Sequence, residues 1–304
     1  MLDDPTPRQA IAAIDASALA GLRQPSDRAG LGHLAGHGGL IAATGSAVAV
    51  ADHWLILVPA ILAHGIALVF LFAPLHESIH GTAFRTAWLN TAVAAVCGAV
   101  LLLPPRYFRW FHFAHHRHTQ NPDRDPELAT PKPDTWGRYL LTLTGIGYWA
   151  GQAGVLVRFA RGRDLPDFVP ARARGKAVAE ARVYLGFYAV LATAAIAGGW
   201  AEWLLWLWIV PVLAGQPFMR AYLLAEHAGC PLVPEMLENS RTTFTNRAVT
   251  WLAWNMPNHT AHHLLPTVPF HALPRATSVL RERIAVTAPG YLAVHTEIAA
   301  RLSA

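Results

Sequence analysis

Histidine is unusually frequent in this chain, and half of its sixteen histidines fall into three short boxes. Imidazole is the commonest side-chain ligand of transition metals, and residues i, i+3 and i+4 of a helix share a face. Each box is therefore expected to project two or three imidazoles in one direction, toward a metal. The candidate ligands are His76 and His80 in H-E-S-I-H, His112, His115 and His116 in H-F-A-H-H, His259, His262 and His263 in H-T-A-H-H, and His227 in A-E-H-A-G.

The number of candidate ligands predicts two metal ions. A single four-coordinate site needs about four ligands, whereas the boxes and His227 offer eight or nine. His118 follows His116 by two residues, and positions i and i+2 of a helix do not share a face, so it is not expected to be a ligand. A lone histidine is more often packed or solvated, and that reading stays open for His227. The other histidines are expected to be structural, exposed or incidental.

Acidic and amide side chains near the boxes could accept a hydrogen bond from the imidazole N–H that faces away from a metal. Such an acceptor fixes the tautomer and the direction of the ring. The candidates are Asp125, Glu127, Asn255 and Asn258, together with Glu77 and Glu226. For residues 121–127 the alternative is a simple turn, because Asn-Pro and Asp-Pro are turn dipeptides.

The composition indicates that lipid surrounds part of the chain. Apolar residues make up 53% and charged residues only 14%, whereas soluble domains carry about 25% charged residues. A helix needs about 20 apolar residues to cross the hydrocarbon core of a bilayer. Five apolar stretches stand out, at residues 34–50, 53–75, 88–103, 183–199 and 203–225.

We expect an all-α integral membrane protein with four transmembrane helices in two hairpins, 34–75 and 183–226, and a helical cytosolic cap that carries the histidine boxes. The cap has two parts, 76–182 and 227–304. The stretch 88–103 would be about 24 Å long as a helix, short of the roughly 30 Å hydrocarbon core. A crossing there would also separate the first box from the second. It is therefore predicted to be re-entrant or interfacial.

Charge asymmetry predicts the orientation of these hairpins. Thirteen Lys and Arg residues lie in 104–182, and none lies in the expected turns at 51–53 and 200–202. The positive-inside rule then places the boxes and both termini in the cytosol. Residues 1–33 are expected to be a cytosolic leader without a cleavable signal. Arg220, near the inner end of its stretch, is expected to reach toward the membrane surface. The net charge of +5 is too small to suggest nucleic-acid binding.

The three boxes resemble the membrane fatty acid desaturase superfamily, whose hallmark is H-x-x-x-H, then H-x-x-H-H, then a second H-x-x-H-H after another membrane hairpin. The resemblance covers a single functional domain of about residues 50–275. The flanking segments H-H-R-H-T-Q-N-P-D-R-D-P-E and W-N-M-P-N-H-T-A-H-H-L-L-P fit a bacterial branch, which implies the bacterial inner membrane. One departure is Ala261, where relatives commonly have Glu, and this could alter metal tuning or substrate.

The resemblance implies a four-span helical fold, a non-haem diiron centre with His227 as an additional ligand, and consumption of O2 and two electrons. The leading hypothesis is desaturation of a fatty acyl or lipid-like substrate. The alternative on the same scaffold is a hydroxylase, ketolase or O-demethylating monooxygenase acting on a carotenoid, another lipid or a small polar, rhizopine-like molecule. A membrane metal transporter is a distant third, because the histidines lie at the ends of the spans.

Electrons for such a reaction are expected to come from a separate protein. The sequence has no CxxC cluster motif and no G-x-G-x-x-G nucleotide fingerprint. A ferredoxin or cytochrome b5-like donor with its reductase is therefore implied. The basic run between Arg158 and Lys176 could dock an acidic donor or contact anionic lipid headgroups, and the sequence favours the second. The substrate, its carrier, the position of oxidation and the oligomeric state stay open.

Overall fold

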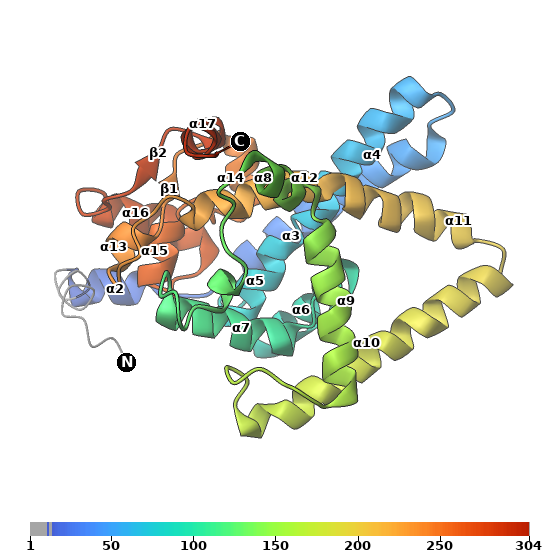
Figure 1. Cartoon of the computed structure of the whole chain (residues 1–304), viewed down its shortest axis with the longest axis horizontal. Coiled ribbons are helices and arrows are strands. Elements are labelled where there is room, and N and C mark those ends of the chain that lie inside the picture. Colours follow the sequence, from blue (N-terminus) through green and yellow to red (C-terminus); the bar gives the residue numbers. More distant parts are fainter. Residues whose placement is uncertain (1–10, 12–13, 304) are drawn as a thin grey trace.

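The computed structural model of this chain describes residue 11 and residues 14–303, so the start of the predicted leader lies outside the described residues. In this range the chain is mostly helical (Figure 1). The first helices are α2 (Ala16–Leu22), α3 (Asp27–Val50), α4 (Trp54–Val69), α5 (Phe72–His80), α6 (Ala87–Leu101), α7 (Pro105–His118), η1 (Pro126–Ala129), α8 (Trp136–Thr144) and α9 (Ile146–Arg161). They are followed by α10 (Ala171–Ala197), α11 (Ala201–Leu204), the π-helical turn η2 (Leu205–Ile209) and α12 (Val210–His227).

The C-terminal part consists of shorter elements that pack over the ends of the long helices. These are α13 (Met236–Asn239), β1 (Thr242–Thr243), α14 (Arg247–Leu252), α15 (His259–Leu264), η3 (Phe270–Ala272), α16 (Leu273–Leu280), β2 (Thr287–Ala288) and α17 (Tyr291–Ala299). Strands β1 and β2 form one short parallel pair, with Thr242 opposite Thr287. An all-α fold with little β-structure was predicted, and the helical class is confirmed.

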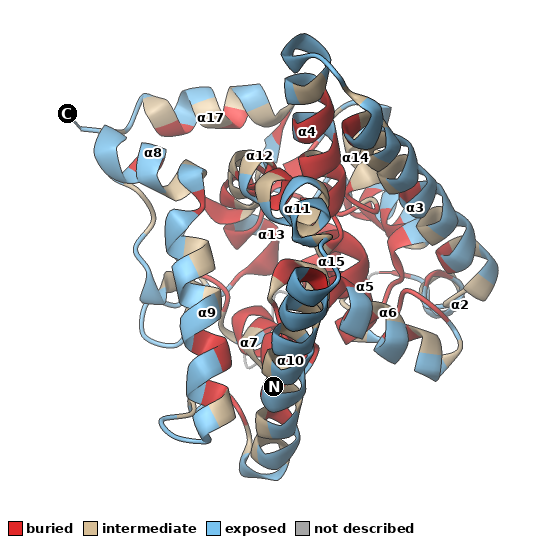
Figure 2. Cartoon of the chain, turned by 90° about the vertical axis from the view of Figure 1, so that its right-hand side faces the viewer, coloured by how far each residue is buried: buried red, intermediate tan, exposed pale blue. Residues whose placement is uncertain are grey.

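Among the described residues, three helices are long and apolar enough to cross a membrane, namely Trp54–His80, Ala171–Ala197 and Ala201–His227. Only 17% of the most apolar part of Ala171–Ala197 is buried inside the protein. Val183, Val190 and Ile196 on this helix are each at least 67% exposed. In water such an apolar surface would be unfavourable, so the surface of this helix is suited to lipid. Figure 2 shows α10 exposed along most of its length, with the buried residues gathered at the centre of the molecule.

The predicted hairpins correspond to observed helix pairs, with shifted boundaries. Helices α3 and α4 pack together and are joined by residues 51–53, although α3 is not among the three candidate spans. Helix α10 begins at Ala171 rather than 183, so its first turns carry the basic residues Arg172, Arg174 and Lys176. Its turn to α11 lies at residues 198–200, and the two helices form a V in Figure 1. The number of spans stays a prediction.

Two bent helix pairs accompany these spans. Helices α6 and α7 meet at 95°, and α8 and α9 meet at 56°; each pair has the length and composition of a broken span or a re-entrant loop. The first pair contains the stretch 88–103, for which a re-entrant or interfacial course was predicted. The second pair was not predicted. Glycines and polar residues interrupt its apolar pattern, and Gly145 forms the bend with a φ of +69° that favours glycine.

Close contact between α4 and α12 fixes the two long helices that lead into the histidine boxes. Gly65 and Gly215 face each other at the crossing: a Cβ at Gly65 would overlap the carbonyl oxygen of Pro211, and a Cβ at Gly215 would overlap the backbone of Gly65. Small residues allow the backbones of membrane helices to approach in this way. Helix α4 continues into α5 with His76 and His80, and α12 ends at His227.

We therefore expect Gly65→Ala to destabilise the protein although alanine is the better helix former. Overpacking typically costs about 1–3 kcal/mol, and the displaced helices would also misplace the histidines. The matched control is Gly186→Ala in α10, where an added Cβ meets nothing within 4 Å. In detergent, the Gly65→Ala variant should melt lower and bind less metal than wild type, whereas Gly186→Ala should melt at or above wild type. Equal melting of the two variants would contradict the close crossing.

Candidate metal centre

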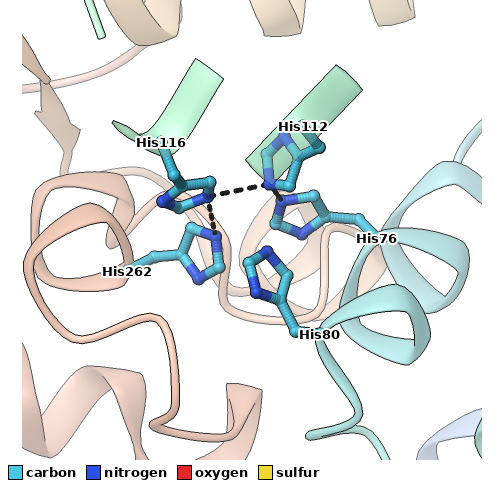
Figure 3. A group of neighbouring side chains, drawn as sticks. All are labelled: His76, His80, His112, His116 and His262. Atoms are coloured by element: carbon cyan, nitrogen blue, oxygen red, sulfur yellow. Dashed lines mark hydrogen bonds between the residues drawn. The ribbon is translucent and has the colours of Figure 1, made fainter. Parts of the chain in front are cut away.

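The predicted histidines come together in two neighbouring groups. The first contains five imidazoles from α5, α7 and α15, whose rings face one another in Figure 3: His76, His80, His112, His116 and His262. The second contains His115, His227 and His263, from α7, α12 and α15. His259 joins this second group through His227, with their Nε2 atoms 3.0 Å apart. The rings of His116 and His263 stack at 4.2 Å between centroids, so the two groups are adjacent.

Helix geometry divides each H-x-x-H-H box between the two groups. Consecutive helical side chains point about 100° apart, whereas i and i+4 differ by only about 40°. In α7, His112 and His116 therefore face the first group and His115 faces the second. In α15 the division is reversed, with His262 in the first group and His259 and His263 on the side of the second. The expectation that each box points in one direction was wrong for these two boxes, because the adjacent pair H-H spans two sites.

Some ring nitrogens within each group have more close nitrogen neighbours than hydrogen bonding can satisfy. His112 Nε2 lies 2.6 Å from His76 Nε2 and 2.8 Å from His116 Nε2. His116 Nε2 also lies 3.1 Å from His262 Nε2. A ring nitrogen has either one N–H or one lone pair, so it can serve only one of two such neighbours. His227 Nε2 likewise has two close ring nitrogens, His115 Nε2 at 3.2 Å and His259 Nε2 at 3.0 Å.

A cation at the centre of each group accounts for this convergence. Imidazole nitrogens bind first-row metal ions at about 2.0–2.1 Å, as in zinc sites, so two nitrogens on neighbouring coordination positions lie about 3.0–3.4 Å apart. The observed contacts fall within a few tenths of an ångström of this range. All ligand atoms within each group lie within 4.8 Å of one another. The residues present therefore fit a metal ion in each group.

In the second group, the opposite nitrogen of every ring faces an oxygen atom. His115 Nδ1 lies 3.0 Å from Asp125 Oδ1, and His227 Nδ1 lies 3.0 Å from the carbonyl oxygen of Asn239. Donation from Nδ1 to these acceptors leaves the lone pair on Nε2, where a metal would bind. His263 Nδ1 lies 3.2 Å from the Thr119 hydroxyl, and Glu226 Oε1 lies 3.4 Å from His259 Nδ1.

The structure thus places some of the predicted acceptors beside imidazoles, and others elsewhere. Asp125 and Glu226 are beside imidazoles as expected, and Glu127 Oε2 is 3.8 Å from His115 Nδ1. The prediction is wrong for Asn255 and Asn258, whose amides donate to the carbonyls of Phe270 and Asn255 and hold the backbone around α15.

Glu77 also differs from the prediction, because its Oε2 accepts from Thr82 and from the Phe270 backbone N–H. Two partners were missed. Thr119 lies three residues after the second box and could have been noticed. Asn239 acts through its backbone carbonyl, for which the sequence holds no signal.

Electrostatics suits neutral imidazoles at most positions of this centre. His115 is the exception: burial lowers its pKa, but Glu127 and Asp125 outweigh this and raise it. Burial, followed by the neighbouring histidines, holds the pKa values of His262 and His263 well below the ordinary range, and His259 is affected in the same direction. At neutral pH these rings keep a lone pair for a metal. Burial would raise the pKa of Asp125, but its hydrogen bond and charge interaction with His115 outweigh this and lower it. Asp125 is therefore ionised beside the ring that it orients.

A cavity of about 360 Å³ lies against both groups. His76 and His112 of the first group line it, together with His115 and His259 on the side of the second. Most other wall residues are apolar or aromatic, including Phe72, Leu103, Phe108, Phe111 and Met256. A molecule in this cavity would be in contact with the metal ligands on one side and with an apolar wall on the other.

Arg220 also lines this cavity, contrary to the expectation that it reaches the membrane surface. Its guanidinium lies over the ring of Tyr148, 4.3 Å from the centroid. Tyr148 belongs to the bent pair α8–α9, which was not predicted, and lines the same cavity.

Residues 52–295 match the sequence model of fatty acid desaturases. The chain belongs to the fatty acid desaturase family. The chain is therefore an oxidoreductase, as the resemblance predicted. The chain is 25% identical over 258 residues to an sn-1 oleoyl-lipid 12-desaturase from Anabaena variabilis, in an alignment that covers 75% of this chain and 70% of that protein.

His227 and His118 provide a direct test of which histidines hold metal in this desaturase. His227 Nε2 is within 3.2 Å of two other imidazole nitrogens, whereas His118 belongs to neither group. His227→Ala should lower the bound metal and abolish activity, because a coordination position is lost. His118→Ala should keep the metal content near wild type and reduce activity only modestly. The measurement is metal per chain and product yield at matched expression; loss of metal in the His118 variant alone would overturn this assignment.

Proposed function

We propose that this protein is a membrane diiron oxidase that uses O2 and two electrons to desaturate an aliphatic, acyl-lipid-like substrate. The observation that supports this most directly is the cavity whose wall includes histidines from both groups. A C–H bond in this cavity would lie beside the metal ligands. The Anabaena relative, named as an oleoyl-lipid desaturase, is consistent with a substrate of this class.

In the proposed enzyme the nine histidines hold two iron ions. The proposed ligands are His76, His80, His112, His116 and His262 for one ion, and His115, His227, His259 and His263 for the other. When bound, iron would supply the activation of O2 that an unactivated C–H bond requires and that no side chain can supply. Asp125, Glu226, Thr119 and the Asn239 carbonyl hold the rings of the second group in the orientation that binding needs.

The apolar wall of the cavity would bind and align the substrate chain. Phe72 and Phe108 pack at 5.3 Å between ring centroids and lie beside His76. Rigid aromatic walls exclude water from the reacting carbon and restrict the positions that the chain can adopt. Removal of a second hydrogen from the neighbouring carbon gives an alkene, so the placement of the chain against this wall decides the outcome.

Electrons are proposed to come from a ferredoxin or cytochrome b5-like protein with its reductase on the cytosolic side of the bacterial inner membrane. The basic residues Arg158, Arg172 and Arg174 lie on α9 and α10. They would contact anionic lipid headgroups or the acidic donor. The four-span topology with both termini in the cytosol belongs to the same proposal.

One observation favours a second candidate, a monooxygenase on the same scaffold. Arg220, Lys132 and Gln152 line the cavity that the histidines line. Polar groups so close to the metal ligands suit a substrate with a polar group near the oxidised carbon. Hydroxylation or O-demethylation of such a molecule would use the same ligands and the same electrons.

Expression with a bacterial ferredoxin and its reductase tests the proposal. Cellular lipids and polar metabolites from cells with wild type and with His116→Ala are compared by mass spectrometry. The proposal predicts a product that lacks two hydrogens and appears only with wild type, because His116 contacts two other ring nitrogens of the first group. A product that gains one oxygen would support the monooxygenase instead. Identical profiles at equal protein and iron content would refute both.

A further inference from the structure

The cavity beside the histidines contains two cationic side chains that have no anionic partner. Arg220 and Lys132 both line it. Among the described residues, no ion pair within 4.0 Å includes Arg220 or Lys132, and neither side chain makes a hydrogen bond. Arg220 Nε in particular is buried without any partner. A buried charged donor without an acceptor is costly, more so than a neutral one.

The acids that line the same cavity face the histidines instead. Glu226 lies 3.4 Å from His259 Nδ1, and Glu127 lies 3.8 Å from His115 Nδ1. Each acid therefore lies nearer to an imidazole of the second group, and neither comes within ion-pair distance of Arg220, on which their charges act only at longer range. The two cations are left available to an external anion.

The guanidinium of Arg220 is held in place for such a contact. Its flat face lies over the Tyr148 ring, and the Tyr148 hydroxyl donates to the Leu101 carbonyl at 3.1 Å. Stacking leaves the edge of the guanidinium, which carries the N–H groups, free to bind a carboxylate or phosphate. Gln152, one turn after Tyr148 on α9, also lines the cavity, and its side-chain amide N–H can donate to an anion.

The position of Arg220 on α12 relates the anion to the metal centre. Arg220 and His227 are seven residues apart, which is about 10 Å of helix rise and nearly two full turns. They therefore project from the same side of α12, and Leu223 and Leu224 between them line the cavity as well. An amphiphile could place its anionic end at Arg220 and its aliphatic part along these leucines toward His76 and His112.

We propose that Arg220, together with Lys132 and Gln152, binds a carboxylate or phosphate group of an amphiphilic substrate whose aliphatic part lies against the histidine groups. The site deepens the proposed function, because it names the substrate as an anionic amphiphile whose charged group enters the cavity with its aliphatic part. The anion-binding step itself needs only the residues described here and no metal.

Binding of three matched probes tests this site. Octanoate, octyl phosphate and octan-1-ol share one alkyl chain and differ in the head group. Their dissociation constants are measured by calorimetry in a nonionic detergent, on iron-loaded protein and on protein stripped with a chelator. For wild type we expect at least one of the anions to bind tenfold or more tightly than the alcohol in both forms. The anion that binds more tightly distinguishes a carboxylate from a phosphate source.

Substitutions then assign the preference to Arg220. Arg220→Gln should remove the tenfold preference and leave octan-1-ol binding unchanged, whereas Arg220→Lys should keep part of it. The matched control is Arg163→Gln, on an exposed residue after α9, which should bind all three probes as wild type does. The ratio of anion to alcohol binding is informative because a purely structural role of Arg220 would weaken all three probes alike.

Two results would overturn the proposal: equal binding of the three probes to wild type, or an unchanged preference in Arg220→Gln. A preference seen only with iron bound would also overturn it, because the anion would then be a metal ligand. Failure of the proposed oxidation is a separate outcome. Protein that binds octanoate through Arg220 but yields no oxidised product would keep this site and refute the function.

Discussion

The convergence of imidazole nitrogens on two buried points is the constraint on which the rest of this structure depends. His112 Nε2 and His227 Nε2 each have two ring nitrogens as close neighbours, and neither can satisfy both through a single proton or lone pair. Only a cation between the rings makes all of these contacts favourable. Helices α5, α7, α12 and α15 must therefore hold their relative positions to within a few tenths of an ångström.

Several otherwise unrelated features serve that requirement. The glycine contact between α4 and α12 sets the spacing of the two long helices that deliver the first box and His227. Asp125, Glu226 and the Asn239 carbonyl hold the outer nitrogens of the second group. In the first group the outer nitrogens of His76, His116 and His262 are buried without a hydrogen bond, whereas in the second group only His259 Nδ1, 3.4 Å from Glu226 Oε1, lacks one. The two groups are thus chemically unlike, although both consist of histidines.

The sequence predicted the helical class, the family and all nine clustered histidines, because regular helical spacing carries that information locally. Division of the boxes between two groups follows from the same geometry, since adjacent histidines diverge by about 100°. Asp125 and Glu226 could be predicted because they lie close to a box along the chain. The Asn239 carbonyl could not, because a backbone acceptor is independent of residue type. The cavity role of Arg220 depends on Tyr148, whose glycine-interrupted helix has no clear apolar pattern.

The central claim is that two irons share this buried set of histidines, and the metal itself tests it most directly. Protein purified from iron-replete cells is analysed for metal per chain, and Mössbauer spectroscopy of isotope-enriched protein then examines the environment of each iron. The account predicts two irons per chain in two distinguishable nitrogen-rich environments, because the outer nitrogens of His115, His227 and His263 are hydrogen-bonded to oxygen atoms and those of His76, His116 and His262 are not. One iron per chain, or full occupancy by zinc in protein that retains its activity, would contradict it.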